Sequence, residues 1–214
     1  MDATTYARRH AARFVSELAG LVSIPTVSAD SRRAPDMRRC ARRLTDLLTA
    51  AGLHHARTLE PTAGAQPAGG SPAPAAAPIV AADWLDAPGA PTVLFYGHYD
   101  VQPADEPGWA HPPFTPVVRG DELHGRGASD DKGQLFAHLK GIESLLATRH
   151  ALPVNVRVIL EGEEENHLPT FFRGVDMSMA LLDELAARAT VANPSSFSTP
   201  RASRRAGSPV GRAA

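Results

Sequence analysis

The chain has 214 residues, of which 43% are hydrophobic and 21% charged, a composition typical of a globular protein with a buried core. Its formal net charge of −1 gives no general attraction to nucleic acid or membranes, so neither is expected as a partner. We find no run with the length of a membrane-spanning helix and predict no signal peptide. The single cysteine, Cys40, cannot form an internal disulfide, which favours a reducing cytoplasm.

Two helices are predicted near the N-terminus. Apolar residues recur at helical spacing from Phe14 to Val22, and Pro25 ends this pattern. A second helix is predicted after Pro35, with its arginines on a solvated face. Its apolar stripe consists of Met37, Cys40, Ala41, Leu44, Leu47, Leu48 and Ala51. The position of Cys40 on this stripe favours core packing over a role as a nucleophile.

Strands and a further helix are predicted in the middle of the chain. Residues 92–96 predict a buried strand that ends at Gly97, and residues 114–123 predict a hairpin that turns at Gly120-Asp121. A long helix is expected from about Lys132, followed by a strand over residues 154–160. This alternation predicts an α/β domain with a layered, mostly parallel central sheet flanked by helices.

The domain is expected to cover residues 1–190. Within it, residues 61–78 are dominated by Ala, Pro and Gly and predict a flexible insertion. A last helix is expected to include Leu181 and Leu185. Residues 191–214 are rich in Ser, Pro, Arg, Ala and Gly and predict a disordered tail.

Three short segments carry residues suited to chemistry, each at or after the end of a predicted element. They are residues 97–103 (GHYDVQP), 125–133 (GRGASDDKG) and 160–165 (LEGEEE). Loops at the carboxyl ends of strands in an open sheet converge on one crevice. We therefore expect the three segments to meet.

In the first segment, His98 and Asp100 would point to the same side if the strand geometry continued past Gly97. An imidazole can bind a metal through one nitrogen while a nearby carboxylate holds the other N–H group. An equal alternative is a histidine at a strand end that is satisfied by a neighbour.

In the second segment, Asp130 and Asp131 place two carboxylates side by side. Such a pair is costly unless a cation neutralises it, and Lys132 is expected to offset part of the cost. For Asp131, capping of the following helix is an equal alternative to a functional role. The glycines lack the last position of a dinucleotide-binding fingerprint, which argues against that kind of site.

In the third segment, four glutamates follow an apolar strand directly: Glu161, Glu163, Glu164 and Glu165. Histidine with carboxylates suits zinc or manganese. A further glutamate that does not bind metal could take a proton from a metal-bound water. The alternative is an acidic run that is merely solvated.

Taken together and in order, these segments resemble a known family. GHYDVQP, the following GW and PPF, GRGASDDKGQ and VNVRVILEGEEE are similar to the zinc-dependent dipeptidase and carnosinase branch of the aminoacylase, carboxypeptidase G and succinyl-diaminopimelate desuccinylase superfamily. The resemblance runs from about residue 14 to about residue 172. It implies an incomplete zinc-peptidase catalytic domain without the lid and dimerisation domain.

The resemblance also implies roles for single residues. His98 matches the histidine ligand of one metal, and Asp100 matches the carboxylate that orients it. Asp130 matches the aspartate that bridges two metals and is often followed by a cis peptide bond. Glu164 matches the general base, and Glu165 matches a ligand of the other metal.

The activity implied is hydrolysis of the amide bond of dipeptides or N-acyl amino acids by a water that two metals activate. Zinc is the expected metal, with manganese or cobalt as alternatives, and a dimer is expected only of full-length relatives. The family supplies a further acidic ligand after the Glu-Glu pair and a second histidine near its C-terminus, whereas His167 is the last histidine here. We therefore interpret the chain as C-terminally truncated and expect weak metal binding and little or no activity from it alone.

Two other functions are kept as hypotheses. The first is a non-catalytic remnant or interaction protein of the same fold. The second is a serine or cysteine hydrolase, which is less favoured because no GxSxG motif is present and Cys40 has no convincing histidine partner.

Overall fold

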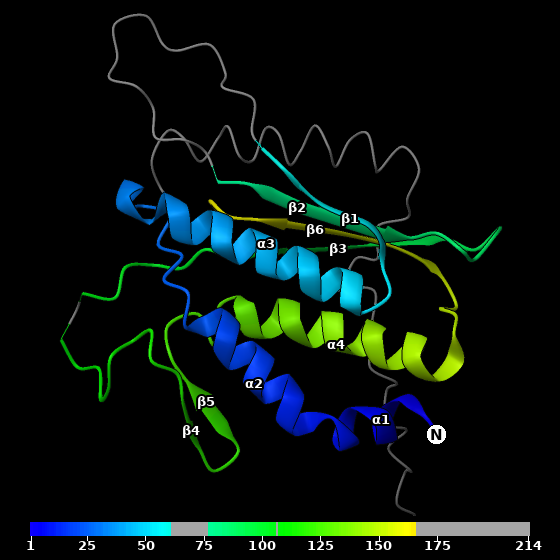
Figure 1. Ribbon diagram of the computed structural model, residues 1–214, viewed down its shortest axis with the longest axis horizontal. Coiled ribbons are helices and arrows are strands. Elements are labelled where there is room, and N and C mark those ends of the chain that lie inside the picture. The colour runs from blue at the N-terminus through cyan, green and yellow to red at the C-terminus, as the bar shows by residue number, and fades with distance from the viewer. Residues whose placement is uncertain (61–76, 106, 166–214) are drawn as a thin grey trace, which may run out of the picture.

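The computed structural model of the chain describes residues 1–60, 77–105 and 107–165, and Figure 1 shows their arrangement. The helices are α1 (Ala3–Arg9), α2 (Ala11–Val22), the 3-10 helix η1 (Ser31–Arg33), α3 (Ala34–Ala50) and α4 (Lys132–Arg149). The strands are β1 (His54–Leu59), β2 (Ile79–Trp84), β3 (Thr92–His98), β4 (Val117–Arg119), β5 (Glu122–His124) and β6 (Asn155–Glu161). Nearly all of the predicted insertion, the last predicted helix and the predicted tail lie outside the described residues.

The main sheet has the order β1-β2-β6-β3, and helices cover one of its faces (Figure 1). The layered α/β class is therefore confirmed, but the described sheet is mixed rather than mostly parallel. Only β3 and β6 pair in parallel, and α4 forms the crossover that a parallel pair needs. The sequence analysis did not predict β1 and β2, which add two antiparallel pairings.

The core lies between the sheet and two helices. Helix α3 packs on β1 and β2, while α4 packs on β3. The whole predicted stripe of α3 is buried, and Cys40 has no exposed surface, which confirms its place in the core. Each leucine buried in this way contributes about 2 kcal/mol to the free energy of unfolding. No helix in the described part of the chain is both long and apolar enough to span a membrane.

Strand β3 differs in part from its prediction. It continues through His98 instead of ending at Gly97, and among the described strands only β6 pairs with it. Its middle residues are half-buried, and Tyr96 is 46% exposed. The predicted hairpin is confirmed, because β4 and β5 pair on either side of Gly120-Asp121 and form a separate two-stranded sheet.

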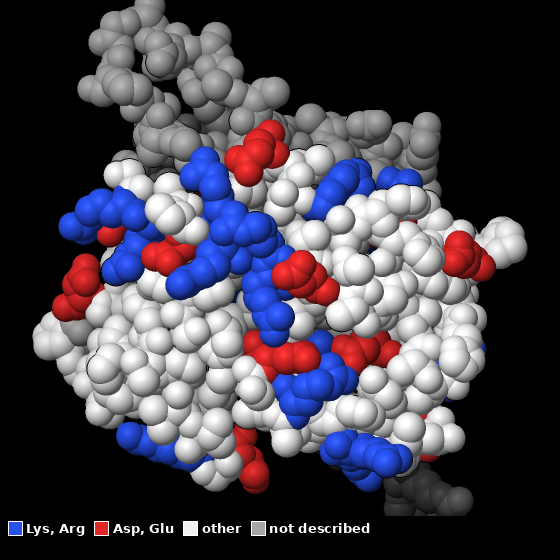
Figure 2. Space-filling model, in the orientation of Figure 1, with Lys and Arg blue, Asp and Glu red and all other residues white. Residues whose placement is uncertain are grey.

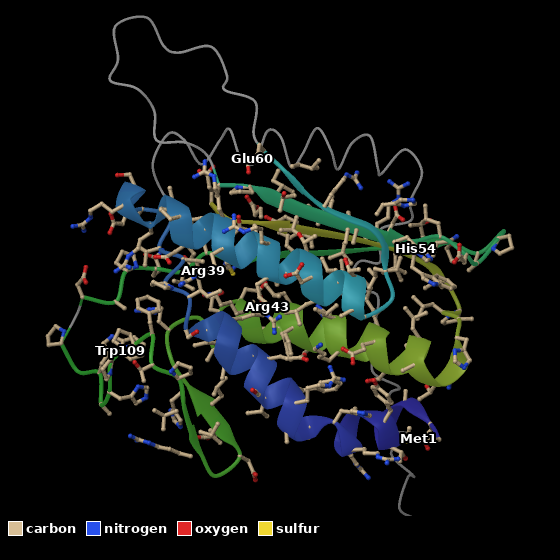
Figure 3. All side chains as sticks on the ribbon, viewed as in Figure 1. Met1, Arg39, Arg43, His54, Glu60 and Trp109 are labelled. Carbon is tan, nitrogen blue, oxygen red and sulfur yellow. The ribbon has the colours of Figure 1, made fainter. Side chains whose placement is uncertain are left out.

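Basic side chains gather over α3 on the face seen in Figure 2. Arg39 and Arg43 project from this helix in Figure 3, and both are exposed. Arg39 forms an ion pair with Asp36 at 3.0 Å, and Arg38 lies 3.9 Å from Glu60. The arginines thus occupy the solvent side of α3, opposite its buried stripe, as predicted.

A buried ionic network joins α2 to α4. The Lys140 ammonium contacts the carboxylates of Glu17 and Glu143, each at 2.6 Å, and the Arg13 guanidinium also contacts Glu143. Burial raises the pKa of both carboxyls, but hydrogen bonds from Lys140 and Arg13 outweigh it and hold each pKa below the ordinary value of 4.5. These groups therefore stabilise the fold above about pH 4.5, and this stabilisation is lost as the pH falls through their lowered pKa values.

We expect Lys140→Met to lower the free energy of unfolding at pH 7 by about 3 kcal/mol, because it removes the buried cation between Glu17 and Glu143 and leaves only the exposed Arg13 to pair with both carboxylates. The fall in stability below pH 4.5 should also become shallower than in the wild type. Urea unfolding between pH 3 and 7 measures both effects. Arg149→Met, on the exposed end of the same helix, is the control and should cost less than about 0.5 kcal/mol. Equal losses of unfolding free energy in the two variants would show that this ionic network does not stabilise the fold.

Candidate metal centre

The three chemistry-bearing segments meet at one edge of the sheet. His98 ends β3 and stands opposite Glu161, which ends β6, so the carboxyl ends of these parallel strands coincide. Asp130 comes from the loop before α4, and Glu164 and Glu165 follow β6. The convergence predicted from the sequence is confirmed.

His98 is the centre of this group, and its ring is buried. Its Nε2 atom lies 3.2 Å from Asp130 Oδ1 and 3.9 Å from Glu164 Oε2. Its Nδ1 atom lies 3.3 Å from Asp100 Oδ1, an ion-pair contact whose geometry falls short of an aligned hydrogen bond. One nitrogen thus faces the Asp100 carboxylate, and the other faces the carboxylates of Asp130 and Glu164.

Asp100 is fully buried and connects three parts of the centre. While Oδ1 faces His98, Oδ2 accepts hydrogen bonds from Ser28 Oγ at 2.7 Å and from the backbone N–H of Glu165 at 3.0 Å. Glu165 is held a second time, because Gln102 Nε2 donates to its carboxylate at 2.7 Å and to its carbonyl oxygen at 3.2 Å. The sequence analysis missed Ser28 and Gln102, although Gln102 belongs to the GHYDVQP segment.

Asp131 and Lys132 do not behave as the sequence suggested. Asp131 stands at the N-terminal cap of α4 but makes no side-chain cap, and its carboxylate instead accepts the backbone N–H of His98 at 3.2 Å. Lys132 does not pair with the two aspartates, because its ammonium donates to the carbonyl oxygens of Leu21 and Ile24. The Asp130-Asp131 peptide bond is cis, as the family resemblance implied.

The four glutamates at and after the end of β6 separate into two pairs. Glu161 and Glu163 are buried, Glu161 beside the Tyr96 hydroxyl and Glu163 accepting the backbone N–H of Ala77 at 3.1 Å. Burial, together with the charge of neighbouring carboxylates, raises the pKa of each to about 7. Glu164 and Glu165 instead face His98, so the acidic run is not simply a solvated surface.

The donor set fits a divalent cation. His98, Glu164 and Glu165 each offer one possible ligand atom, and these three atoms lie within 4.8 Å of one another. Asp130 Oδ1 also lies close to His98 Nε2, at 3.2 Å. An imidazole with several carboxylates is a donor set that zinc and manganese accept. The negative field is strong: burial disfavours the charged His98 ring, but Asp100, Glu164 and Asp131 outweigh it and raise the pKa of His98 to about 9. A bound divalent cation would neutralise the negative charge of these neighbouring carboxylates.

Comparison with known proteins relates this centre to a family. Residues 94–195 match the model of peptidase family M20/M25/M40, a span that includes every metal-facing side chain named above. The chain is similar to this family over that span, which is slightly less than half of its length. The span continues past residue 172, where the resemblance noted from the sequence ends.

The curated relatives that this chain matches include two kinds of dipeptidase. It is 41% identical over 111 residues to the Beta-Ala-His dipeptidase of Rattus norvegicus, a match that covers 46% of the chain and 23% of the relative. It is 37% identical over 158 residues to the Cys-Gly metallodipeptidase DUG1 of Candida albicans, covering 72% of the chain and 32% of the relative. The chain thus spans about a third or less of the length of these relatives.

The fold agrees with solved structures of the M20 family. The dipeptidase Dug1p of Saccharomyces cerevisiae aligns with a TM-score of 0.77 at 27% identity, over 88% of this chain and 39% of that one. Human carnosine dipeptidase 1 aligns with a TM-score of 0.74 at 29% identity, again over 88% and 39%. The described sheet and helices therefore match part of the fold of these dipeptidases.

We expect Asp100→Asn to weaken binding of Zn²⁺ by about 10- to 100-fold, because the buried charge that orients both His98 and Glu165 is lost. Titration against a competing chelator measures the change. Asp121→Asn, in the exposed hairpin turn, should leave the affinity unchanged. Unchanged affinity in Asp100→Asn would show that Asp100 does not orient the ligands.

Gly97 has no room for a side chain, because a Cβ atom there would lie 2.8 Å from Asp131 Oδ2 and 3.4 Å from Leu135 Cβ. Gly97→Ala should therefore displace the carboxylate that holds the His98 backbone and weaken Zn²⁺ binding about tenfold. Gly141→Ala is the control, since a Cβ atom at that position of α4 meets no atom within 4 Å. Equal Zn²⁺ affinities in the two variants would contradict this role of Gly97.

Proposed function

We propose that this chain carries the metal-binding front part of an M20 peptidase that hydrolyses the amide bond of dipeptides or N-acyl amino acids. The observation that carries the proposal is the meeting of one imidazole with four carboxylates at the carboxyl ends of β3 and β6. The printed names of two relatives, Beta-Ala-His dipeptidase and Cys-Gly metallodipeptidase, support a small peptide as substrate. The buried single thiol supports a reducing cytoplasm as its location.

Similarity to this family implies divalent metal ions, and we propose two, with zinc as the first candidate and manganese or cobalt as alternatives. When bound, such ions polarise the scissile carbonyl and lower the pKa of a bound water. His98 would bind through Nε2 while Asp100 holds its Nδ1 side. Glu165 would be a ligand of the second ion, and Asp130 would bridge the two.

Glu164 would act as the general base. It is half-exposed at the centre, with one carboxylate oxygen 3.9 Å from His98 Nε2. A carboxylate in this position can take a proton from a water at the centre and pass it to the leaving amine. Its exposure suits this role better than the burial of Glu161 and Glu163 does.

The 214 residues supply few ligands for each ion. No histidine follows His167 in the sequence, so any second histidine ligand of the family type is absent from this chain. Two protein ligands per ion leave the charge poorly satisfied, which predicts weak binding. The rival proposal is a non-catalytic chain of the same fold, which would keep the cluster but not the reaction.

The test combines metal analysis with peptide cleavage by the 214-residue chain. After dialysis against Zn²⁺, we expect weakly held metal that depends on His98 and Glu165, and slow hydrolysis of Cys-Gly or β-Ala-His. Glu164→Gln should keep the metal and lose hydrolysis by about 100-fold or more.

The possible results separate the hypotheses. Metal content no higher than in His98→Ala would reject the metal centre. Metal retention with hydrolysis no faster than in Glu164→Gln would favour the non-catalytic chain. Two tightly held zinc ions with rapid turnover would show that the ligands within these 214 residues are sufficient.

A further inference from the structure

The short segment of residues 24–28 contains no metal-facing side chain, yet it contacts two of the three loops that carry them. It follows α2 and precedes η1, far from either loop in the sequence. Ile24, Thr26 and Val27 are buried, and Ser28 is half-buried. Its polar groups are directed at the metal centre rather than at solvent.

On one side, the segment holds the loop after β3. Thr26 Oγ1 donates to the carbonyl oxygen of Tyr99 at 2.6 Å, and the Val101 N–H donates to the carbonyl oxygen of Thr26 at 2.9 Å. Asp100 lies between Tyr99 and Val101 in the sequence, and its carboxylate accepts a hydrogen bond from Ser28 Oγ at 2.7 Å. The backbone on both sides of Asp100 and its side chain are therefore fixed by a segment 72 residues earlier in the chain.

On the other side, the segment holds the loop before α4 through Lys132. This side chain is 1% exposed, and its ammonium donates to Ile24 O at 2.7 Å and to Leu21 O at 3.0 Å. These carbonyls lie at and just beyond the C-terminal end of α2, where a helix has free acceptors and a partial negative charge. A buried ammonium must stay within hydrogen-bond distance of its acceptors, because leaving it without partners is strongly destabilising. Lys132 directly follows Asp130 and Asp131, so its position sets theirs.

We propose that Ile24–Ser28 is a brace that sets the distance between the Asp100 loop and the Asp130 loop, with Ser28 and Lys132 as positioning residues. Its effect on the cluster is direct: Asp100 and Asp130 contact opposite nitrogens of one imidazole, 3.3 Å and 3.2 Å away. A shift of either loop would change the arrangement of ligand atoms. The inference rests on the proposed metal-binding function, but the brace itself can be measured without metal.

The first test compares two serines of the same region. Ser28→Ala should weaken Co²⁺ and Zn²⁺ binding about tenfold and alter the visible absorption spectrum of bound Co²⁺, and Ser28→Thr should restore both. Ser23→Ala is the matched control, because Ser23 Oγ also makes one hydrogen bond, to Gly20 O, but lies outside the brace. Wild-type affinity and spectrum in Ser28→Ala would overturn the proposal.

The second test compares two buried lysines of α4. Lys132→Met and Lys140→Met should both destabilise the fold, but only Lys132→Met should also reduce Co²⁺ affinity under conditions where each variant is folded. Equal Co²⁺ affinity in the two folded variants would remove Lys132 from the brace. The serine variants keep the proposal testable if Lys132→Met does not fold.

Hydrogen exchange of the metal-free chain separates this inference from the proposed function. In Ser28→Ala, the amides of Val101 and Glu165 should exchange at least several times faster than in the wild type, while Ser23→Ala should not change them. If the wild type binds no Co²⁺ but these amides respond, the metal centre fails and the brace remains. If the amides do not respond, the brace is rejected whatever the metal result.

Discussion

The candidate centre depends on one buried carboxylate. Asp100 has no exposed surface, and its two oxygens connect His98, Ser28 and the backbone of Glu165. A charge in such a place is retained only when its surroundings satisfy it, and each of these partners is thereby fixed in turn. Residues from two remote segments, together with the neighbouring His98, are thus held by a single side chain, which makes the cluster a property of the fold rather than of one motif.

The fold provides this arrangement through the β3–α4–β6 unit. Parallel pairing of β3 with β6 brings His98 beside the residues that follow Glu161, and α4 begins directly after the Asp130 loop. The backbone N–H of His98 then bonds to Asp131, which ties the strand end to the start of the helix. Similarity to the M20 family agrees with this geometry, and the match to Dug1p shows that the same layers occur in a larger peptidase.

The sequence predicted the parts of the fold and site that rest on local patterns. The stripe of α3, the hairpin at Gly120-Asp121 and the meeting of His98 with Asp130 and the Glu-Glu pair were all predicted. The contacts of Ser28 and Lys132 were not predicted, because each joins residues more than 70 positions apart. Such contacts produce no periodic pattern in the sequence. The antiparallel pairing of β1 and β2 was missed for a related reason, since the short run of β2 gives no sign of its partners.

The contacts of the α2 end also bear on where this domain can be divided. The family match begins at residue 94, and all the metal-facing side chains lie beyond that point. A fragment trimmed to this boundary would keep every ligand and lose Thr26, Ser28 and the carbonyls that receive Lys132. The smallest fragment that keeps these contacts therefore extends back at least to α2, across a stretch that contributes no candidate ligand.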